Sequence, residues 1–113
     1  MATVRQHFED RDAVVRAIYR DIVAAAGRLG AFTEEPKKTS IHLVRRTAFA
    51  GVATRKSALM LTLKSANDIK SPRIVKREQA SANRWYMYIR LDDPKQLDAQ
   101  LKSWLKKSFE LAG

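Results

Sequence analysis

The sequence predicts an α+β fold, a two-layer sandwich in which an antiparallel four- to five-stranded sheet carries an N-terminal and a C-terminal helix on one face. Apolar residues recur at three- and four-residue steps near both ends of the chain, as in amphipathic helices. In the middle of the chain they alternate with polar residues, as in half-buried strands. Two such helices and one such sheet bury their apolar sides most economically in two layers. The length of 113 residues suits a single domain, residues 1–113.

The first helix is expected from Asp10 to about Leu29. Its apolar stripe consists of Val14, Val15, Ile18, Ile22, Val23, Ala26 and Leu29. Asp10 or Asp12 can cap its first turn, and Gly27 and Gly30 can end it.

A polar segment with a proline, Thr33–Lys38, follows and is expected to be a connecting loop. The strands are expected as a meander at residues 39–46, 47–52, 58–64 and 84–91, and Arg73–Arg77 forms a short edge strand or no strand. Residues 84–91 separate into an apolar side and a basic, aromatic side: Trp85, Met87, Ile89 and Leu91 oppose Arg84, Tyr86, Tyr88 and Arg90.

The last helix is expected to begin at Asp92 or Asp93 as a cap, with Pro94 in its first turn, and to run to Phe109. The core is expected to contain the inward-facing residues of both helices and the sheet: Ile18, Ile22, Ile41, Leu43, Phe49, Leu59, Leu61, Leu63, Trp85, Met87, Ile89, Leu97, Leu101, Trp104 and Leu105.

The formal net charge of +10 is concentrated in the middle of the chain. Residues 36–64 carry seven basic residues and no acidic one, and residues 65–91 carry six basic and two acidic ones, whereas both ends are nearly neutral. Because the strands fall in this middle part, the sheet should attract an anionic partner.

The sequence offers little for catalysis. There is no cysteine, which excludes disulfides and zinc–thiolate sites, and there is no metal-ligand spacing, glycine-rich phosphate loop or nucleophile elbow. The two histidines, His7 and His42, lie far apart, and a half-exposed strand position is the preferred interpretation of His42. We therefore expect no catalytic residues, no metal and no cofactor.

Apolar runs are far shorter than the roughly 20 residues that a membrane span requires, so no membrane partner is expected. The first residues carry charges where a signal peptide would be apolar, and the chain is accordingly expected in the cytoplasm.

Several spaced elements carry a family resemblance: Phe8; Gly27-Arg28-Leu29-Gly30; the segment Lys37 to Leu43 with Arg45-Arg46 and Phe49-Ala50; Leu59 to Leu63; Ser71-Pro72-Arg73; Ile89-Arg90-Leu91; and Leu97-Asp98, Leu101, Trp104-Leu105 and Phe109. With them the chain resembles a small bacterial family of domains of unknown function, sometimes found as the C-terminal module of proteins labelled predicted transport proteins. The resemblance covers nearly the whole chain. It implies a compact α+β domain and no particular activity, substrate or cofactor.

The basic, aromatic side of the sheet is the candidate site. If the helices cover the apolar side, alternation directs the other side chains, with Thr62 and His42, to the opposite face. The residues expected to meet an anionic partner are Arg84, Tyr86, Tyr88, Arg90, Lys64, Arg45 and Arg46. Rings that stack on bases and cations that neutralise phosphates favour single-stranded nucleic acid, and an acidic protein is the other anionic candidate.

Three alternatives remain open at the level of sequence. Arginine and tyrosine side chains can simply cover a solvated sheet. The open face, with Met60, Val44 and the tyrosines, can dock a second copy or another protein, which gives a self-associating domain without a nucleic-acid role. A pocket near Phe8 and Arg45-Arg46 can hold a small carboxylate or phosphate.

Overall fold

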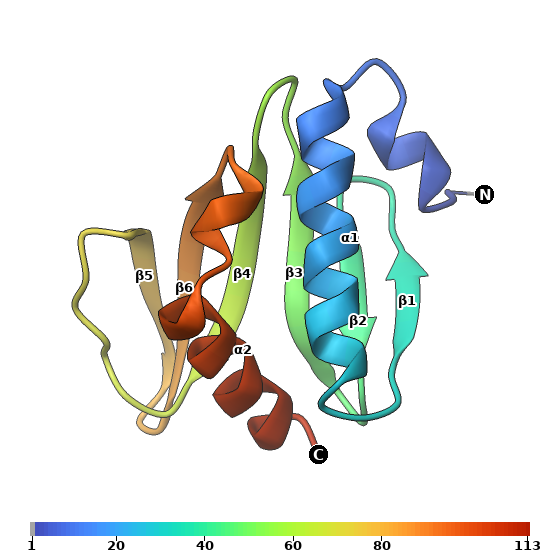
Figure 1. Ribbon diagram of the computed structural model, residues 1–113. Helices are drawn as coiled ribbons and strands as arrows, with labels where there is room; N and C mark the ends of the chain where they lie inside the picture. The colour runs from blue at the N-terminus through green and yellow to red at the C-terminus, as the bar shows by residue number, and fades with distance from the viewer. Residues whose placement is uncertain (1) are drawn as a thin grey trace.

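The computed structural model describes residues 2–113 and contains one antiparallel sheet with both α-helices on the same face (Figure 1). The elements in chain order are the 3-10 turn η1 (Arg5–Phe8), α1 (Ala13–Gly27), β1 (Thr33–Pro36), β2 (Ile41–Val44), β3 (Ala48–Thr54), β4 (Leu59–Ser65), β5 (Ile74–Ser81), β6 (Arg84–Leu91), the 3-10 turn η2 (Pro94–Gln96) and α2 (Ala99–Leu111). The predicted α+β class and the placement of both helices on one face are confirmed.

The sheet has six strands rather than four to five, because two polar segments pair at its edges. The expected loop at Thr33–Lys38 is wrong: residues 33–36 form β1, which pairs with β2. Residues Ile74–Ser81 form β5, a strand longer than the expected edge segment. Both strands are largely exposed, so neither needs the apolar alternation by which strands are recognised in a sequence.

The strand order β1-β2-β3-β4-β6-β5 departs from the expected simple meander. After β4 the chain passes over one strand position, forms β5 at the outer edge, and returns as β6 between β4 and β5. This order places β6, which carries the tyrosines, inside the sheet and not at its edge.

The helix boundaries differ from the sequence prediction at both N-termini. Asp12 occupies the N-cap of α1, but its carboxylate makes no cap hydrogen bond and lies 3.5 Å from Lys56 Nζ. Asp93 caps only the short turn η2. α2 itself starts later, where the Asp98 carboxylate accepts a hydrogen bond from Leu101 N.

The core lies between the helices and the sheet, and the predicted core residues are buried with one exception. Trp85 is only half-buried, because it lies near the β5–β6 turn and pairs with Gln79 of the exposed strand β5. Among residues 2–113, neither α-helix combines the length and the apolar composition that a membrane span needs.

Candidate functional site

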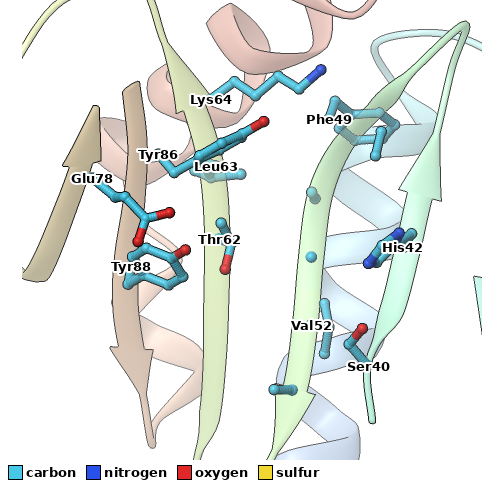
Figure 2. A pocket seen from close by; sticks show the side chains of 14 residues that line it. Ser40, His42, Phe49, Val52, Thr62, Leu63, Lys64, Glu78, Tyr86 and Tyr88 are labelled. Atoms are coloured by element: carbon cyan, nitrogen blue, oxygen red, sulfur yellow. The ribbon is translucent and has the colours of Figure 1, made fainter. Parts of the chain in front are cut away.

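The side chains of β6 alternate as the sequence predicts. Met87 and Ile89 are buried beneath the helices, whereas Tyr86 and Tyr88 are half-buried and line a hollow on the helix-free face. We call this side of the sheet the open face. Figure 2 shows it with the helices behind the sheet.

The hollow has a volume of about 410 Å³ and lies over the centre of the sheet. Its lining comes from the five neighbouring strands β2, β3, β4, β6 and β5 and from the residue before β2: Ser40, His42, Ala48, Phe49, Ala50, Gly51, Val52, Ala53, Thr62, Leu63, Lys64, Glu78, Tyr86 and Tyr88. The volume falls within the range of roughly 300–1,000 Å³ that is typical of small-ligand sites.

Strand register fixes how the lining residues face one another. His42 pairs with Gly51, Gly51 pairs with Thr62, and Thr62 pairs with Tyr88. In Figure 2 the tyrosine side chains and His42 therefore stand on opposite sides of β3. The hollow thus has an aromatic wall on β6 and an imidazole on β2.

Lys64 lines the cationic end of the hollow, and Arg84 lies near Lys64 outside the lining. Lys64 pairs with Tyr86, and its ammonium donates a hydrogen bond to Thr47 Oγ1 at 3.1 Å. Burial lowers the pKa of Lys64, and the nearby guanidinium of Arg84 lowers it further. Since neither cation has a carboxylate partner among residues 2–113, a bound anion would relieve their mutual repulsion.

Ser108 of α2 fixes the backbone at Lys64 from the other side of the sheet. The pairing of β3 with β4 ends at Ala50 and Leu63, so the next backbone groups have no partner in the ladder. The Ser108 hydroxyl fills the gap: it accepts from Lys64 N at 2.9 Å and donates to Phe49 O at 2.6 Å. The cationic end is therefore tied to the helix layer.

A carboxylate also belongs to the hollow. Glu78 pairs with Tyr86, and Figure 2 shows its carboxylate between the two tyrosine side chains. Its Oε2 lies 3.5 Å from Lys76 Nζ. The middle of the hollow is therefore unsuited to an anionic group, because the Glu78 carboxylate faces it beside the tyrosines.

The remaining predicted partner residues lie outside the hollow. Arg90 belongs to the far end of β6, about 20 Å from Arg84 at 3.3 Å per residue, and forms an ion pair of 2.8 Å with Asp92. The Arg45 guanidinium lies 4.4 Å from the Phe109 ring centroid and donates to Phe109 O. Arg45 therefore supports the end of α2.

Arg46 is exposed and follows Arg45 in the turn between β2 and β3. Its neighbour Thr47 accepts the Lys64 hydrogen bond, so Arg46 belongs to the end of the sheet where Lys64 lies. The pocket expected near Phe8 and Arg45-Arg46 does not form as a unit, because Phe8 packs against Tyr19, at a ring separation of 5.0 Å, while Arg45 packs against Phe109.

Sequence reasoning missed Ser40, Gly51 and Glu78. Gly51 carried a usable signal, since a glycine inside an alternating strand often marks a place where another group approaches the backbone. No sequence signal pointed to Glu78, because only the pairing of β5 with β6 brings Glu78 beside Tyr86.

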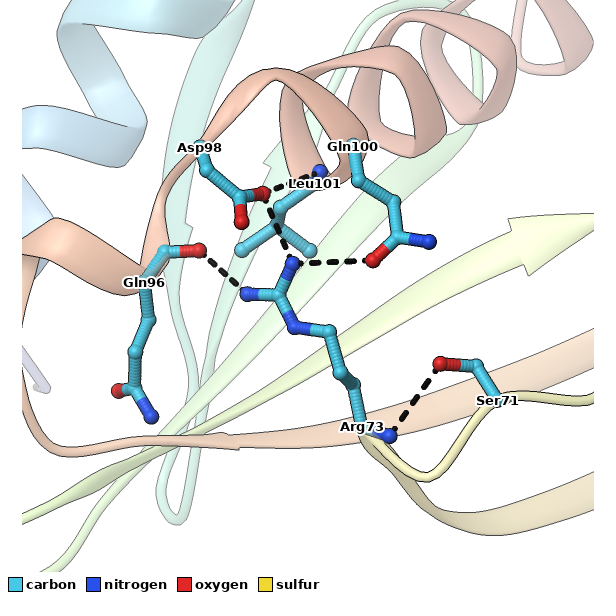
Figure 3. A network of polar contacts seen from close by, with 6 residues as sticks. All are labelled: Ser71, Arg73, Gln96, Asp98, Gln100 and Leu101. Atoms are coloured by element: carbon cyan, nitrogen blue, oxygen red, sulfur yellow. Dashed lines mark hydrogen bonds and ion pairs between the residues drawn. The ribbon is translucent and has the colours of Figure 1, made fainter.

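The segment Ser71-Pro72-Arg73, which the family resemblance singles out, has a structural role. Figure 3 shows Arg73 reaching from the start of β5 to α2, where it donates to Asp98 Oδ1 at 2.8 Å, to Gln100 Oε1 and to Gln96 O. The hydrogen bond from Leu101 N and then the contact with Arg73 lower the pKa of Asp98. Arg73 therefore fastens the edge hairpin to the start of α2.

Comparison with family models decides the family. Residues 4–112 match the model described as "Domain of unknown function (DUF5655)". The chain belongs to the DUF5655 family. Comparison of this DUF5655 domain with curated proteins gives no match, and comparison with solved structures gives none either. Within residues 2–113 of the DUF5655 domain, no three His, Asp or Glu side chains gather as metal ligands would.

Proposed function

We propose that this domain is a non-enzymatic binding module whose open face holds an anionic partner, with single-stranded nucleic acid as the leading candidate. One observation carries the proposal: Tyr86 and Tyr88 share a single hollow with Lys64, beside Arg84. Modules that bind single strands combine stacking rings with cations that neutralise the backbone. Such a partner agrees with the cytoplasmic location expected from the sequence.

The partner is contacted chiefly through one end of the open face. Lys64 and Arg84 receive the phosphates, and the tyrosine rings stack on bases. Arg90 already has Asp92 as its ion-pair partner, so we expect it to contribute less than Arg84. The tyrosine hydroxyls are not essential to stacking, so Tyr86→Phe should retain most of the affinity.

Fluorescence anisotropy with a labelled single-stranded oligonucleotide of about 12 nucleotides tests the proposal. The logarithm of the affinity should fall with the logarithm of salt concentration, by about 0.7 for each neutralised phosphate. Arg84→Ala should reduce that slope by about 0.7. Tyr86→Ala should weaken binding by about 1–3 kcal/mol, the usual loss for one stacked base.

Two controls make the test specific. Lys106→Ala removes one positive charge from an exposed position on α2, across the sheet from the open face, and should leave the slope unchanged. Thermal melting of each variant establishes that it is folded. Absence of binding by the wild-type domain at low salt would refute the nucleic-acid proposal.

The second candidate is a self-associating or protein-docking domain. The observation that favours it is Val75, a large apolar side chain that is 59% exposed on the edge strand β5. Sheet edges of this kind are places where a further strand can pair. Light scattering over a concentration series separates the two ideas, since a monomer at every concentration argues against self-association.

A further inference from the structure

The hollow exists because β3 presents no large side chain to the open face. Its half-buried positions are Ala48, Gly51 and Ala53, while the larger residues of the strand are buried in the core. The side chains of β2 and β4 on either side of β3 are about two strand spacings apart, or about 10 Å. A trough therefore runs along β3, with the Gly51 backbone as the middle of its floor.

The fold itself does not require a glycine at this position. Gly51 is not one of the residues with a positive φ, so its backbone is open to other residues. A Cβ built at Gly51 would lie 3.5 Å from Thr62 Cβ, an ordinary van der Waals contact. Glycine inside a strand lowers stability, because it loses more freedom on folding and has no side chain to pack. What glycine provides here is space above the strand backbone.

The charged residues around the trough restrict which ligand can bind in this space. Glu78 lines the hollow beside the tyrosines, and a carboxylate repels an anionic group placed against it. The cations Lys64 and Arg84 lie together at one end. A matching ligand is therefore neutral and hydrogen-bonding in the middle, and negatively charged at the Lys64 end.

The side walls of the trough also combine two kinds of surface, apolar rings and hydrogen-bonding groups. By strand register, Thr62 and then Tyr88 lie on one side of Gly51, and His42 lies on the other. Flat apolar surface therefore alternates with groups that can donate or accept hydrogen bonds. A planar heterocycle with polar edges fits such a lining better than an alkyl chain or a bare phosphate does.

We propose that the trough over Gly51 takes up one unstacked base of a single-stranded nucleic acid, with the adjoining phosphate at Lys64 and Arg84. This inference rests on the proposed function and adds where and how the base is held. The base lies over the Gly51 backbone between Thr62 and His42. Base insertion, and not backbone attraction alone, then supplies much of the affinity.

The test compares an ordinary single-stranded oligonucleotide with an abasic one of the same length, by fluorescence anisotropy. The wild-type domain should bind the ordinary strand at least about 5-fold more tightly, because the abasic strand lacks both the inserted base and any base stacked on Tyr86. Gly51→Val fills the trough and should bind the ordinary strand about 5- to 150-fold more weakly than the wild-type domain does, the loss expected for one base. Its affinity for the abasic strand should not change.

Thermal melting provides the second readout. Gly51→Ala and Gly51→Val should melt at or above the wild-type temperature, by up to about 5 °C, because the backbone does not need glycine. Gly27→Ala is the matched control: Gly27 ends α1 on the other side of the sheet and has no atom within 4 Å of an added Cβ. Gly27→Ala should change the melting temperature slightly and leave the affinities for the ordinary and the abasic strand unchanged.

The outcomes separate this inference from the proposed function. Equal binding of ordinary and abasic strands, or wild-type affinity in Gly51→Val, would overturn base insertion while the anionic open face still stood. A melting temperature lowered by more than about 5 °C in Gly51→Ala would show that the fold needs the glycine, and would also overturn it. Failure of the wild-type domain to bind either strand would remove the proposed function itself.

Discussion

Replacement of Ser108 by alanine tests how the helix layer supports the open face. The hydroxyl is fully buried and serves two backbone groups at once, as acceptor for Lys64 N and donor to Phe49 O. Because the β3–β4 ladder has already ended at this point, these groups have no other partner when the hydroxyl is removed. Ser108→Ala therefore leaves one donor and one acceptor unsatisfied.

The expected loss in the free energy of unfolding follows from the two unsatisfied groups, Lys64 N and Phe49 O. Leaving one buried polar group without a partner costs about 1–3 kcal/mol, so two cost about 2–4 kcal/mol when some relaxation is allowed. A domain of this size is stabilised by about 5–15 kcal/mol, so the loss is a large part of the total. The site should suffer as well, since the Lys64 backbone loses its tie to α2.

Urea unfolding at equilibrium, followed by tryptophan fluorescence, measures the effect. We expect the midpoint for Ser108→Ala to fall clearly with an unchanged slope. Ser103→Ala is the matched control, because Ser103 is exposed on the same helix and should stay within about 0.5 kcal/mol of wild type. A Ser108→Ala midpoint equal to that of the control would refute the bridging role.

Three further predictions concern other contacts. Tyr19→Phe removes the 2.5 Å hydrogen bond to Glu34 and should lower the free energy of unfolding by about 1–2 kcal/mol in the same urea assay, whereas an unchanged midpoint would contradict it. Because the pKa of Asp98 is lowered in the fold, the Asp98 carboxylate stabilises the fold above its unfolded pKa near 4, and this stabilisation is lost as pH falls through the folded pKa. The free energies of unfolding of wild type and Asp98→Asn should therefore differ at neutral pH and converge in acid. A difference that stays constant with pH would contradict this. Arg45→Met should cost about 0.5–1 kcal/mol through its contact with Phe109 and leave oligonucleotide affinity essentially unchanged, while a large loss of affinity would return Arg45 to the binding surface.

Periodicity predicted the elements that are buried on one side. Leu59, Leu61 and Leu63 alternate because every second side chain of β4 enters the core, and the same reasoning placed Tyr86 and Tyr88 on the open face. These predictions depend only on which face of a strand is buried, and alternation encodes that directly.

The edges of the sheet and the details of the site depend on pairing between distant segments. β1 is four residues long, polar and ends in Pro36, and backbone pairing with β2 alone defines it as a strand. Glu78 reaches the hollow only because β5 pairs with β6. Gly51 becomes the floor because its neighbours His42 and Thr62 stand on either side of it. Strand order and register set these relations, and local composition does not encode them.

Chemical-shift mapping locates the bound strand on the domain residue by residue. An isotope-labelled domain is titrated with a short single-stranded oligonucleotide at low salt, and the backbone amide signals are followed. Binding of a single strand to the open face predicts saturable shifts centred on Gly51, Thr62 and Tyr88, with α1 and α2 nearly unaffected. Shifts confined to the helices, or none on the open face, would contradict it.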